Sequence, residues 1–189
     1  MLIDNNNSEN SIYMKNAFSR EEMDFLFEGA REIRTKKNTL IYEQGDILKH
    51  VYWLADGLAE VYLSNNEGMK QVMCYHYAPS IIADVSAFEE KKTILTCNAV
   101  KSCLLYKCSI DTFYDRIQSM GLMRRYLKLL VEKTQTAAIQ LGSIAMEDCE
   151  ERVSRYYNNQ LTHQQLADLI GCTRVQVTRI INKKYKKKA

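Results

Sequence analysis

The side chains best suited to chemistry lie near the C-terminus, in a segment that combines arginine with glutamine and asparagine. Arg174, Gln176, Arg179 and Asn182 occur there close together. Arginine recognises guanine through paired hydrogen bonds in the major groove, and glutamine or asparagine recognises adenine in the same way. The segment therefore predicts contacts to the base edges of double-stranded DNA.

Two short helices are expected to position these side chains. Thr162 can cap the first helix, Gln165 can complete a capping box, and Gly171 can end the helix. Thr173 can cap the second helix, whose apolar residues follow the 3.6-residue period. The apolar faces of the two helices comprise Leu166, Ala167, Leu169, Ile170, Val177, Ile180 and Ile181. The pair predicts a helix-turn-helix, whose second helix enters the major groove.

The composition is that of a folded protein with a basic end. The chain has 189 residues, 46% of them hydrophobic, and a net charge of +3. This length allows one large domain, or one medium and one small domain. From residue 172 onward there are two arginines and five lysines but no acid, a distribution typical of nucleic-acid binding. Residues 1–10 are polar and no apolar run reaches 18 residues, so we expect no signal peptide, no membrane contact and a cytoplasmic protein.

Residues 18–118 contain many short candidate strands separated by turn residues. Ser19 can cap a helix that precedes them, with Glu22 closing a capping box. Turn signals include Gly45 and Gly57. The candidate strands are 32–35, 39–42, 50–54, 58–63, 70–77, 95–100 and 103–107. Strands at this spacing predict an α+β fold that begins with an antiparallel β-roll of the jelly-roll type.

A long helix is expected over 119–150, after a shorter helix that begins at Ser109. Apolar and small residues recur along it at alternating spacings of four and three, which is the heptad pattern of a helical seam. The seam comprises Met123, Leu127, Leu130, Thr134, Ala137, Leu141 and Ile144. Its partner is either a second copy of the chain or the β-roll of the same chain. We favour a parallel homodimer, because helix-turn-helix dimers bind two-fold symmetric operators.

These elements, in this order, resemble the CRP/FNR superfamily of transcription regulators over about residues 18–183. The resemblance rests on Gly45, the segment 51–54 and Gly57 in the roll, and on the segment 171–180, which reads Gly-Cys-Thr-Arg-Val-Gln-Val-Thr-Arg-Ile. It implies a homodimer that binds a pseudo-palindromic site on double-stranded DNA. The expected domains are an N-terminal arm (1–17), a β-roll sensor (18–118), a dimerisation helix (119–150) and a helix-turn-helix domain (151–189).

The resemblance also implies roles for individual residues. Arg174 and Arg179 fall on base-contacting positions, and Thr173 and Thr178 fall on positions that contact phosphate or sugar. Val175 stands where many members carry a base-reading glutamate. The full set of expected DNA-binding residues is Thr162, Thr173, Arg174, Gln176, Thr178, Arg179 and Lys183. The sequence ends soon afterwards, so we expect no β wing beyond the recognition helix.

The cassette with which family members bind a cyclic nucleotide is missing. It holds Gly-Glu for the ribose and Arg-Ser for the phosphate, whereas this chain carries Asp84 and Ile94 in the matching segments. Asp84 could reach a hydroxyl, but Ile94 cannot neutralise a buried phosphate. We therefore expect a small apolar or aromatic effector rather than a cyclic nucleotide, or a packed roll without a ligand. The expected effector pocket comprises Met73, Tyr75, Ile82, Asp84, Val85, Ile94 and Leu95.

The cysteines do not form the N-terminal cluster of the iron–sulfur oxygen sensors. The first is Cys74, beside His76, and Cys97, Cys103 and Cys108 lack the spacing of a metal site. The sequence therefore predicts no metal and no cofactor. Thiol redox sensing stays an alternative, because Cys103 and Cys108 could approach each other, and a haem role is a weaker one.

The prediction is thus a dimeric, sequence-specific transcription regulator. One alternative is a dimeric small-molecule or protein-binding module whose DNA-binding end has degenerated. Another is a thiol or haem redox sensor that regulates transcription. An enzyme is not expected, because none of the three histidines, His50, His76 and His163, lies in a nucleophile or metal motif.

Overall fold

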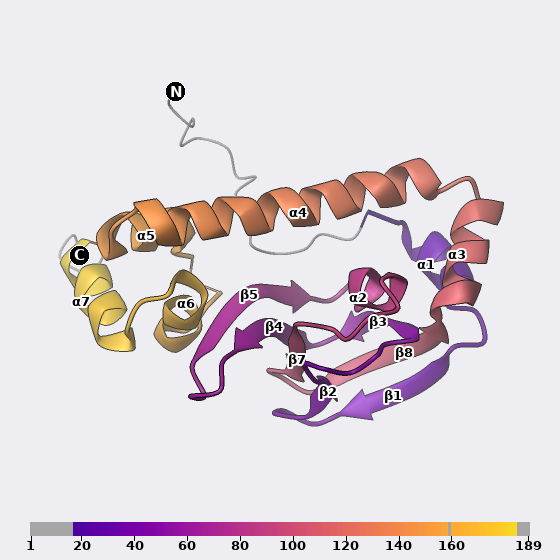
Figure 1. The fold of residues 1–189 in the computed structure, drawn as a ribbon, viewed down its shortest axis with the longest axis horizontal. Coiled ribbons are helices and arrows are strands. Elements are labelled where there is room, and N and C mark those ends of the chain that lie inside the picture. The colour runs from indigo at the N-terminus through magenta and orange to yellow at the C-terminus, as the bar shows by residue number, and fades with distance from the viewer. Residues whose placement is uncertain (1–16, 159, 185–189) are drawn as a thin grey trace. The chain divides into compact units, whose positions relative to one another are not determined.

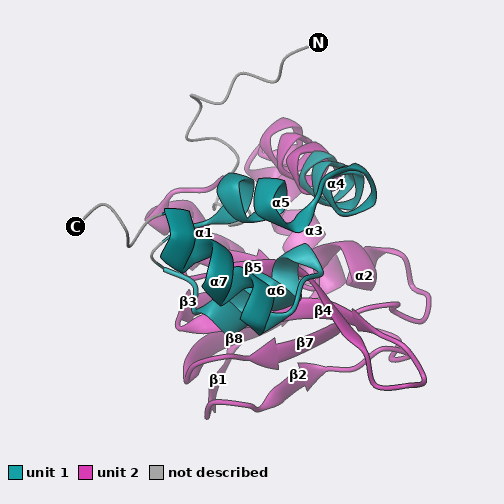
Figure 2. Ribbon diagram, turned by 90° about the vertical axis from the view of Figure 1, so that its left-hand side faces the viewer, with its two compact units in different colours: residues 1–12, 135–189 teal, residues 13–134 magenta. Residues whose placement is uncertain are grey.

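The computed structural model describes residues 17–158 and 160–184. The predicted N-terminal arm, apart from Ala17, and the lysine-rich end at 185–189 lie outside the described residues. The described residues form two compact units that divide inside the longest helix, between Thr134 and Gln135 (Figure 2). The predicted domain boundaries at 118 and 150 stay predictions.

The unit that ends at Thr134 contains an antiparallel β-roll of two four-stranded sheets (Figure 1). The strand order is β1-β8-β3-β6 in one sheet and β2-β7-β4-β5 in the other. The predicted fold class, a roll followed by helices, is confirmed. The strands are β1 Arg31–Thr35, β2 Leu40–Tyr42, β3 His50–Asp56, β4 Leu58–Ser64, β5 Lys70–Tyr77, β6 Ser80–Ile82, β7 Thr96–Ala99 and β8 Cys103–Ser109.

One short strand was not predicted. β6 begins immediately after Ala78–Pro79, where the sequence indicates only a turn. It pairs with β3 through Tyr52 opposite Ile82 and Leu54 opposite Ser80. A three-residue strand is too short to show a hydrophobic period, so the pairing with β3 is what reveals it.

Two helices cover one sheet of the roll through aromatic packing. α1 (Arg20–Leu26) is capped by Ser19 with the predicted capping box, and α3 (Ile110–Ser119) is capped by Ser109. The ring of Phe27, at the end of α1, lies 5.9 Å from that of Trp53 and 5.7 Å from that of Phe113. In a strand of a sheet with one solvent-exposed face, buried and exposed side chains alternate. The ring contacts with α1 and α3 explain why Trp53 on β3 is buried.

Gly57 makes the turn between β3 and β4 possible. Its φ angle is +106°, and a Cβ atom built on it would lie 2.4 Å from the carbonyl oxygen of Ser102. No side chain fits there without displacing backbone, so the predicted turn at Asp56–Gly57 is fixed by the glycine.

The predicted long helix is present as α4 (Met123–Met146), but it ends earlier than expected. Asp148 accepts hydrogen bonds from the N–H groups of Glu150 and Glu151, and its own N–H donates to the Glu151 side chain, so a new helix begins. This helix, α5 (Cys149–Tyr156), begins before the predicted end of the long helix at 150. Between the two helices Glu147 forms an ion pair with Arg155.

α5, α6 (His163–Ile170) and α7 (Arg174–Lys184) pack into a three-helix group in the second unit (Figure 1). Its buried side chains include Val153, Leu166, Leu169, Val177 and Ile181. In the described part of the chain, no helix is both long and apolar enough to cross a membrane.

Candidate nucleic-acid interface

The first helix of the predicted pair, α6, has the expected ends. The Thr162 hydroxyl accepts a hydrogen bond from the N–H of Gln165, and the Gln165 side chain accepts one from the N–H of Thr162 at 2.9 Å. Gly171 ends the helix in the left-handed conformation, with a φ of 64°. The hydroxyl and the N–H of Thr162 are therefore used to cap α6, and the rest of its exposed side chain is what could reach DNA.

The second helix, α7, begins with a capping box of its own. The Thr173 hydroxyl accepts from the N–H of Gln176, while Oε1 of Gln176 accepts from the N–H of Thr173 at 3.0 Å and from its hydroxyl at 2.8 Å. The predicted contact of Gln176 with DNA stays a prediction, and its carbonyl oxygen is used in the cap. Its amide nitrogen is the group left for DNA.

Three side chains of α7 are fully exposed and face outward. Arg174 and Arg179 form no ion pair with any residue that the structure describes, and both are exposed. The side chain of Val175 is 77% exposed, which is unusual for an apolar residue on a short helix. Val175 and Arg179 are four residues apart and so lie on the same face of the helix. The helix thus presents two free guanidinium groups and one apolar group together.

Thr178, which is predicted to contact DNA, forms a hydrogen bond within the protein. Its Oγ1 lies 2.9 Å from Nδ1 of His163, and its side chain is half-buried. The hydrogen bond joins α6 to α7 across the turn. Fifteen residues separate the two in sequence, so no helical period could have indicated this contact.

The last turn of α7 carries cations that lie near α5. Lys184 Nζ lies 3.1 Å from Glu150 and 2.8 Å from the Ser154 hydroxyl, whereas Lys183 Nζ lies 3.8 Å from Glu150. The side chain of Lys183 remains mostly exposed. Lys183 can therefore turn toward a phosphate, while Lys184 is held more firmly within the protein.

An ion pair occupies the interior of the roll next to α2 (Asp84–Phe88). Asp84 is buried and Lys133 of α4 is half-buried, and Lys133 Nζ lies 2.7 Å from each carboxylate oxygen of Asp84. The Tyr126 hydroxyl lies 3.5 Å from the same carboxylate. Lys133 thus already pairs with both oxygens of Asp84, and a contact between Asp84 and a ligand hydroxyl stays a prediction.

The comparisons with known proteins agree with this arrangement of roll and helix-turn-helix. Residues 32–120 match the family model of the cyclic nucleotide-binding domain, and residues 160–188 match that of the bacterial regulatory proteins of the crp family. The chain belongs to the CRP/FNR superfamily. It is a transcription regulator of that family, and its relatives are transcription regulators rather than enzymes.

Relatives in this superfamily are distant in sequence. The chain is 23% identical over 163 residues to the cAMP-activated global transcriptional regulator CRP of Salmonella typhimurium, with 77% of each protein covered. The structure of the c-di-GMP responsive global regulator CLP of Xanthomonas campestris matches with a TM-score of 0.73 at 14% identity, over 90% of this chain and 93% of that one. The structure of CprK complexed with OCPA also matches with a TM-score of 0.73, at 12% identity, over 96% and 92%. These two structures support the fold alone.

The predicted effector residues of this CRP/FNR regulator lie on several different elements of the roll. Tyr75 lies opposite Glu60 in the β4–β5 pair, whereas its neighbours Cys74 and His76 lie opposite Val61 and Ala59. Because successive residues of a strand face opposite sides, Tyr75 points away from the core that Cys74, Val61 and Ala59 help to form. The Tyr75 side chain is nevertheless fully buried, and its place in an effector pocket stays a prediction.

The other members of that set are also dispersed. Met73 is the extra residue of the bulge in β5, and Ile82 belongs to the packed core. Val85 and Ile94 are exposed, by 48% and 68% of their surface. Leu95 packs partly against the core. We therefore do not carry the predicted apolar effector site forward.

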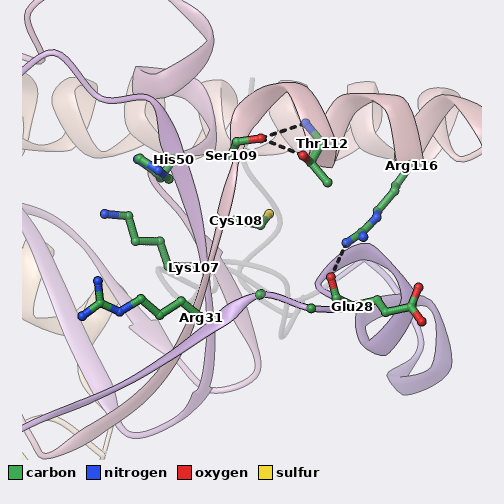
Figure 3. Close-up of a pocket in the computed structure, with 10 residues that line it drawn as sticks. Glu28, Arg31, His50, Lys107, Cys108, Ser109, Thr112 and Arg116 are labelled. Carbon is green, nitrogen blue, oxygen red and sulfur yellow. Dashed lines mark hydrogen bonds between the residues drawn. The ribbon is translucent and has the colours of Figure 1, made fainter.

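A hollow in the described part of the roll lies beside β1 and β8 (Figure 3). It has a volume of about 550 Å³. Arg31 and Lys107 face each other in register and extend with His50 to one side of the strands, whereas Arg116 extends on the other side (Figure 3). Arg116 already donates to the backbone carbonyl of Glu28 at 2.8 Å. These cations do not converge on one point, so we assign no ligand to the hollow.

The cysteines of the roll are not a redox pair. Cys103 and Cys108 lie on the same strand, β8, five positions apart, and so face opposite sides about 16 Å from each other. A disulfide requires Cα atoms within about 7 Å, so the prediction that the two could approach is wrong. Burial raises the pKa of the Cys108 thiol to about 11 and that of the Cys74 thiol to about 12, which keeps both protonated and unreactive.

A buried histidine lies beside Cys74. His76 Nδ1 lies 2.7 Å from the Ser80 hydroxyl, and its Nε2 lies 3.5 Å from the Cys74 sulfur. Burial, together with the charge of Lys133, lowers the pKa of His76 to about 3. The imidazole is therefore neutral at physiological pH and hydrogen-bonded inside the roll.

The exposed face of α4 differs slightly from the predicted seam. Met123 and Leu130 pack partly against the core of the roll. The exposed apolar side chains include Leu127, Val131 and Leu141, at 53%, 54% and 66%. Together with Thr134 and Ala138, both exposed, they repeat at spacings of four and three. We call this set, Leu127, Val131, Thr134, Ala138 and Leu141, the exposed seam of α4.

Proposed function

We propose that this CRP/FNR regulator is a homodimer that binds a pseudo-palindromic site on double-stranded DNA through α7, without a cyclic nucleotide. The observation that carries the proposal is the outward face of α7, where Arg174, Val175 and Arg179 are exposed on a helix with a capped start. Arginines suit guanine edges, and an apolar side chain suits the methyl group of thymine. The capping box and the His163–Thr178 hydrogen bond hold this face in place before DNA binds.

The exposed seam of α4 supports the dimer. A heptad repeat of leucine, valine and small residues is the pattern that packs two helices side by side. Burying each large apolar side chain of the seam against a second copy stabilises the complex by roughly 1.5–3 kcal/mol. Two copies would then present two recognition helices, as a two-fold symmetric operator requires.

The Asp84–Lys133 ion pair supports independence from cyclic nucleotides. A cyclic nucleotide bound next to α2 would have to separate Lys133 from Asp84 and would leave its own phosphate near a buried carboxylate. Leaving one charge of a buried pair without its partner costs about 3–5 kcal/mol. The relative of Salmonella typhimurium is described as cAMP-activated, so the Asp84–Lys133 pair would distinguish this chain from it.

The test begins with recovery of genomic DNA fragments on the full chain, followed by fluorescence anisotropy with the enriched site at two salt concentrations. We expect salt-sensitive binding, since phosphate contacts release counterions. Arg179→Ala should weaken binding by about 1–3 kcal/mol if Arg179 reads guanine. Arg34→Ala, which removes an exposed arginine from β1, is the matched control and should bind as the unchanged chain does.

Cyclic AMP and cyclic GMP are added in a second series, and we expect no change in affinity with either. Stimulation by a cyclic nucleotide would overturn that part of the proposal. Absence of salt-sensitive DNA binding in both series would overturn the proposal as a whole. It would favour the alternative of a binding module with a degenerate DNA-binding end.

A further inference from the structure

The carboxylate of Glu150, in the first turn of α5, contacts both lysines in the last turn of α7. Its Oε1 lies 3.1 Å from Nζ of Lys184, and its Oε2 lies 3.8 Å from Nζ of Lys183. The Ser154 hydroxyl accepts a hydrogen bond from Lys184 Nζ at 2.8 Å and donates one to the backbone carbonyl of Glu150 at 2.7 Å. One carboxylate therefore holds two cations of the predicted recognition helix, one on each oxygen.

The same two lysines are candidates for contacts with the DNA backbone. The C-terminal end of a recognition helix can contact the backbone, as it does in homeodomains, and Lys183 belongs to the predicted DNA-binding set. Each contact between a lysine and a phosphate releases a counterion from DNA and so contributes to affinity. A phosphate and a carboxylate both accept charge-assisted hydrogen bonds from an ammonium group. Glu150 and a phosphate are therefore alternative partners of the same cations.

We propose that Glu150 is an affinity-limiting residue of the DNA interface, which competes with DNA phosphates for Lys183 and Lys184. The inference rests on the proposed function, because it requires that α7 binds DNA. In the free chain the two lysines contact Glu150. On DNA they exchange the carboxylate for phosphate, so the gain from each phosphate contact is offset in part by the contact that is lost.

The exposure of the three side chains sets the strength of this competition. All of them retain access to solvent, and Lys183 is the most exposed. Ion pairs between exposed side chains are weak, so a phosphate can displace Glu150. Loss of the Glu150 charge should therefore strengthen operator binding about two- to fivefold rather than by orders of magnitude.

Glu151 provides a matched control at the next position of the chain. Its side chain accepts a hydrogen bond from the N–H of Asp148, and it forms no ion pair with a lysine in the part of the chain that the structure describes. Glutamine preserves this contact, since a capping box accepts either glutamate or glutamine. Glu150→Gln and Glu151→Gln therefore remove the same charge from the same helical turn, and only Glu150→Gln releases the two lysines.

The first measurement tests the contact without DNA. The full chain is treated with a limiting amount of an amine-acylating ester, and the labelled lysines are located by mass spectrometry, with the exposed Lys128 of α4 as internal reference. We expect Lys184 to react about two- to fivefold faster in Glu150→Gln than in the unchanged chain or in Glu151→Gln, because its amine is released. Equal labelling of Lys184 in all three chains would overturn the proposal.

The second measurement is fluorescence anisotropy with the enriched operator. Glu150→Gln should bind about two- to fivefold more tightly than Glu151→Gln. The plot of log affinity against log salt concentration should also be steeper, by about 0.9 for each lysine released to a phosphate. If no chain binds DNA, the proposed function fails and this inference fails with it. If the unchanged chain binds and Glu150→Gln binds no more tightly than Glu151→Gln, only this inference fails.

A further series tests whether the gain in affinity depends on the lysines. Lys183→Gln and Lys184→Gln are introduced together into the unchanged chain, into Glu150→Gln and into Glu151→Gln. Without the two lysines, Glu150→Gln should bind as Glu151→Gln does, because no cation remains to be released. A gain as large as in the chains that keep both lysines would come from the lower negative charge alone and would overturn the proposal.

Discussion

The ammonium of Lys133 and the carboxylate of Asp84 form a buried ion pair with both Nζ–O distances at 2.7 Å. A buried charge without its partner is strongly destabilising, so we expect Lys133→Met to lower the free energy of unfolding by about 3–5 kcal/mol. The double variant Lys133→Met with Asp84→Leu should recover most of this loss, since apolar groups can replace a buried pair at little cost. Urea unfolding monitored by the fluorescence of Trp53, the single tryptophan, reports on the roll that contains the pair.

Lys128→Met is the matched control for that experiment. Lys128 lies on the same helix and is exposed, with Glu132 at 3.8 Å as its ion-pair partner. We expect a change within about 0.5 kcal/mol, as for most surface substitutions. A Lys133→Met chain as stable as the Lys128→Met chain would show that the buried pair contributes nothing to the stability of the roll.

The stability of the roll should fall in mild acid because of His76. Burial holds the pKa of His76 at about 3 in the folded chain, whereas a histidine in the unfolded chain has a pKa of about 6.5. Below that value the unfolded state binds a proton that the folded state does not, so stability decreases as the pH falls toward 3. Proton uptake by His76 in the unfolded chain lowers the free energy of unfolding by about 2 kcal/mol between pH 7 and pH 5.

Urea unfolding of the unchanged chain and of His76→Gln at the two pH values isolates this contribution. Other groups titrate equally in both chains. The difference between the two chains in their loss of unfolding free energy therefore comes from His76. We expect the His76→Gln chain to lose about 2 kcal/mol less between pH 7 and pH 5. The same loss in both chains would contradict a neutral, buried His76.

Features set by neighbours in sequence could be predicted, and features set by distant residues could not. Thr162 with Gln165 and Ser19 with Glu22 are capping boxes three residues apart, and both are present. The same signal exists at Asp148, three residues before Glu151, and would have shown the true end of α4.

The contacts that the sequence analysis missed join residues far apart in the chain. Lys133 meets Asp84 across 49 positions, and the His163–Thr178 hydrogen bond joins two different helices of the second unit. No hydrophobic period or turn signal contains this information. A bulge between Val61 and Tyr62 likewise alters which residues of β5 face the core, and no sequence signal indicates that bulge.

The proposed dimer predicts the effect of a charge in the exposed seam of α4. Leu141 is 66% exposed, so Leu141→Glu should not disturb the folded monomer. In the dimer it would place two carboxylates in an apolar interface, and we expect dissociation to become about 100-fold more favourable, since each leucine contributes roughly 1.5–3 kcal/mol when buried. Sedimentation equilibrium measures this, with Gln135→Glu at another exposed position of α4 as the control. Equal association of the two variants would place the dimer interface elsewhere.

Val175 is expected to set part of the sequence preference. Its exposed methyl groups on the face shared with Arg179 suit the methyl group of thymine. Replacing thymine with deoxyuridine, one position at a time, should reveal one base in each half-site where the unchanged chain loses affinity. The Val175→Ala chain should not respond to that replacement, because the contact is already gone.

A glutamate at the same position should favour cytosine, whose amino group donates to a carboxylate. We therefore expect Val175→Glu to shift the preferred base at that one position by about 1–3 kcal/mol and to leave the bases read by Arg174 and Arg179 unchanged. Competition among a library of operators randomised at single positions measures both effects at once. A uniform loss of affinity at every position would mean that Val175 supports the helix rather than reading a base.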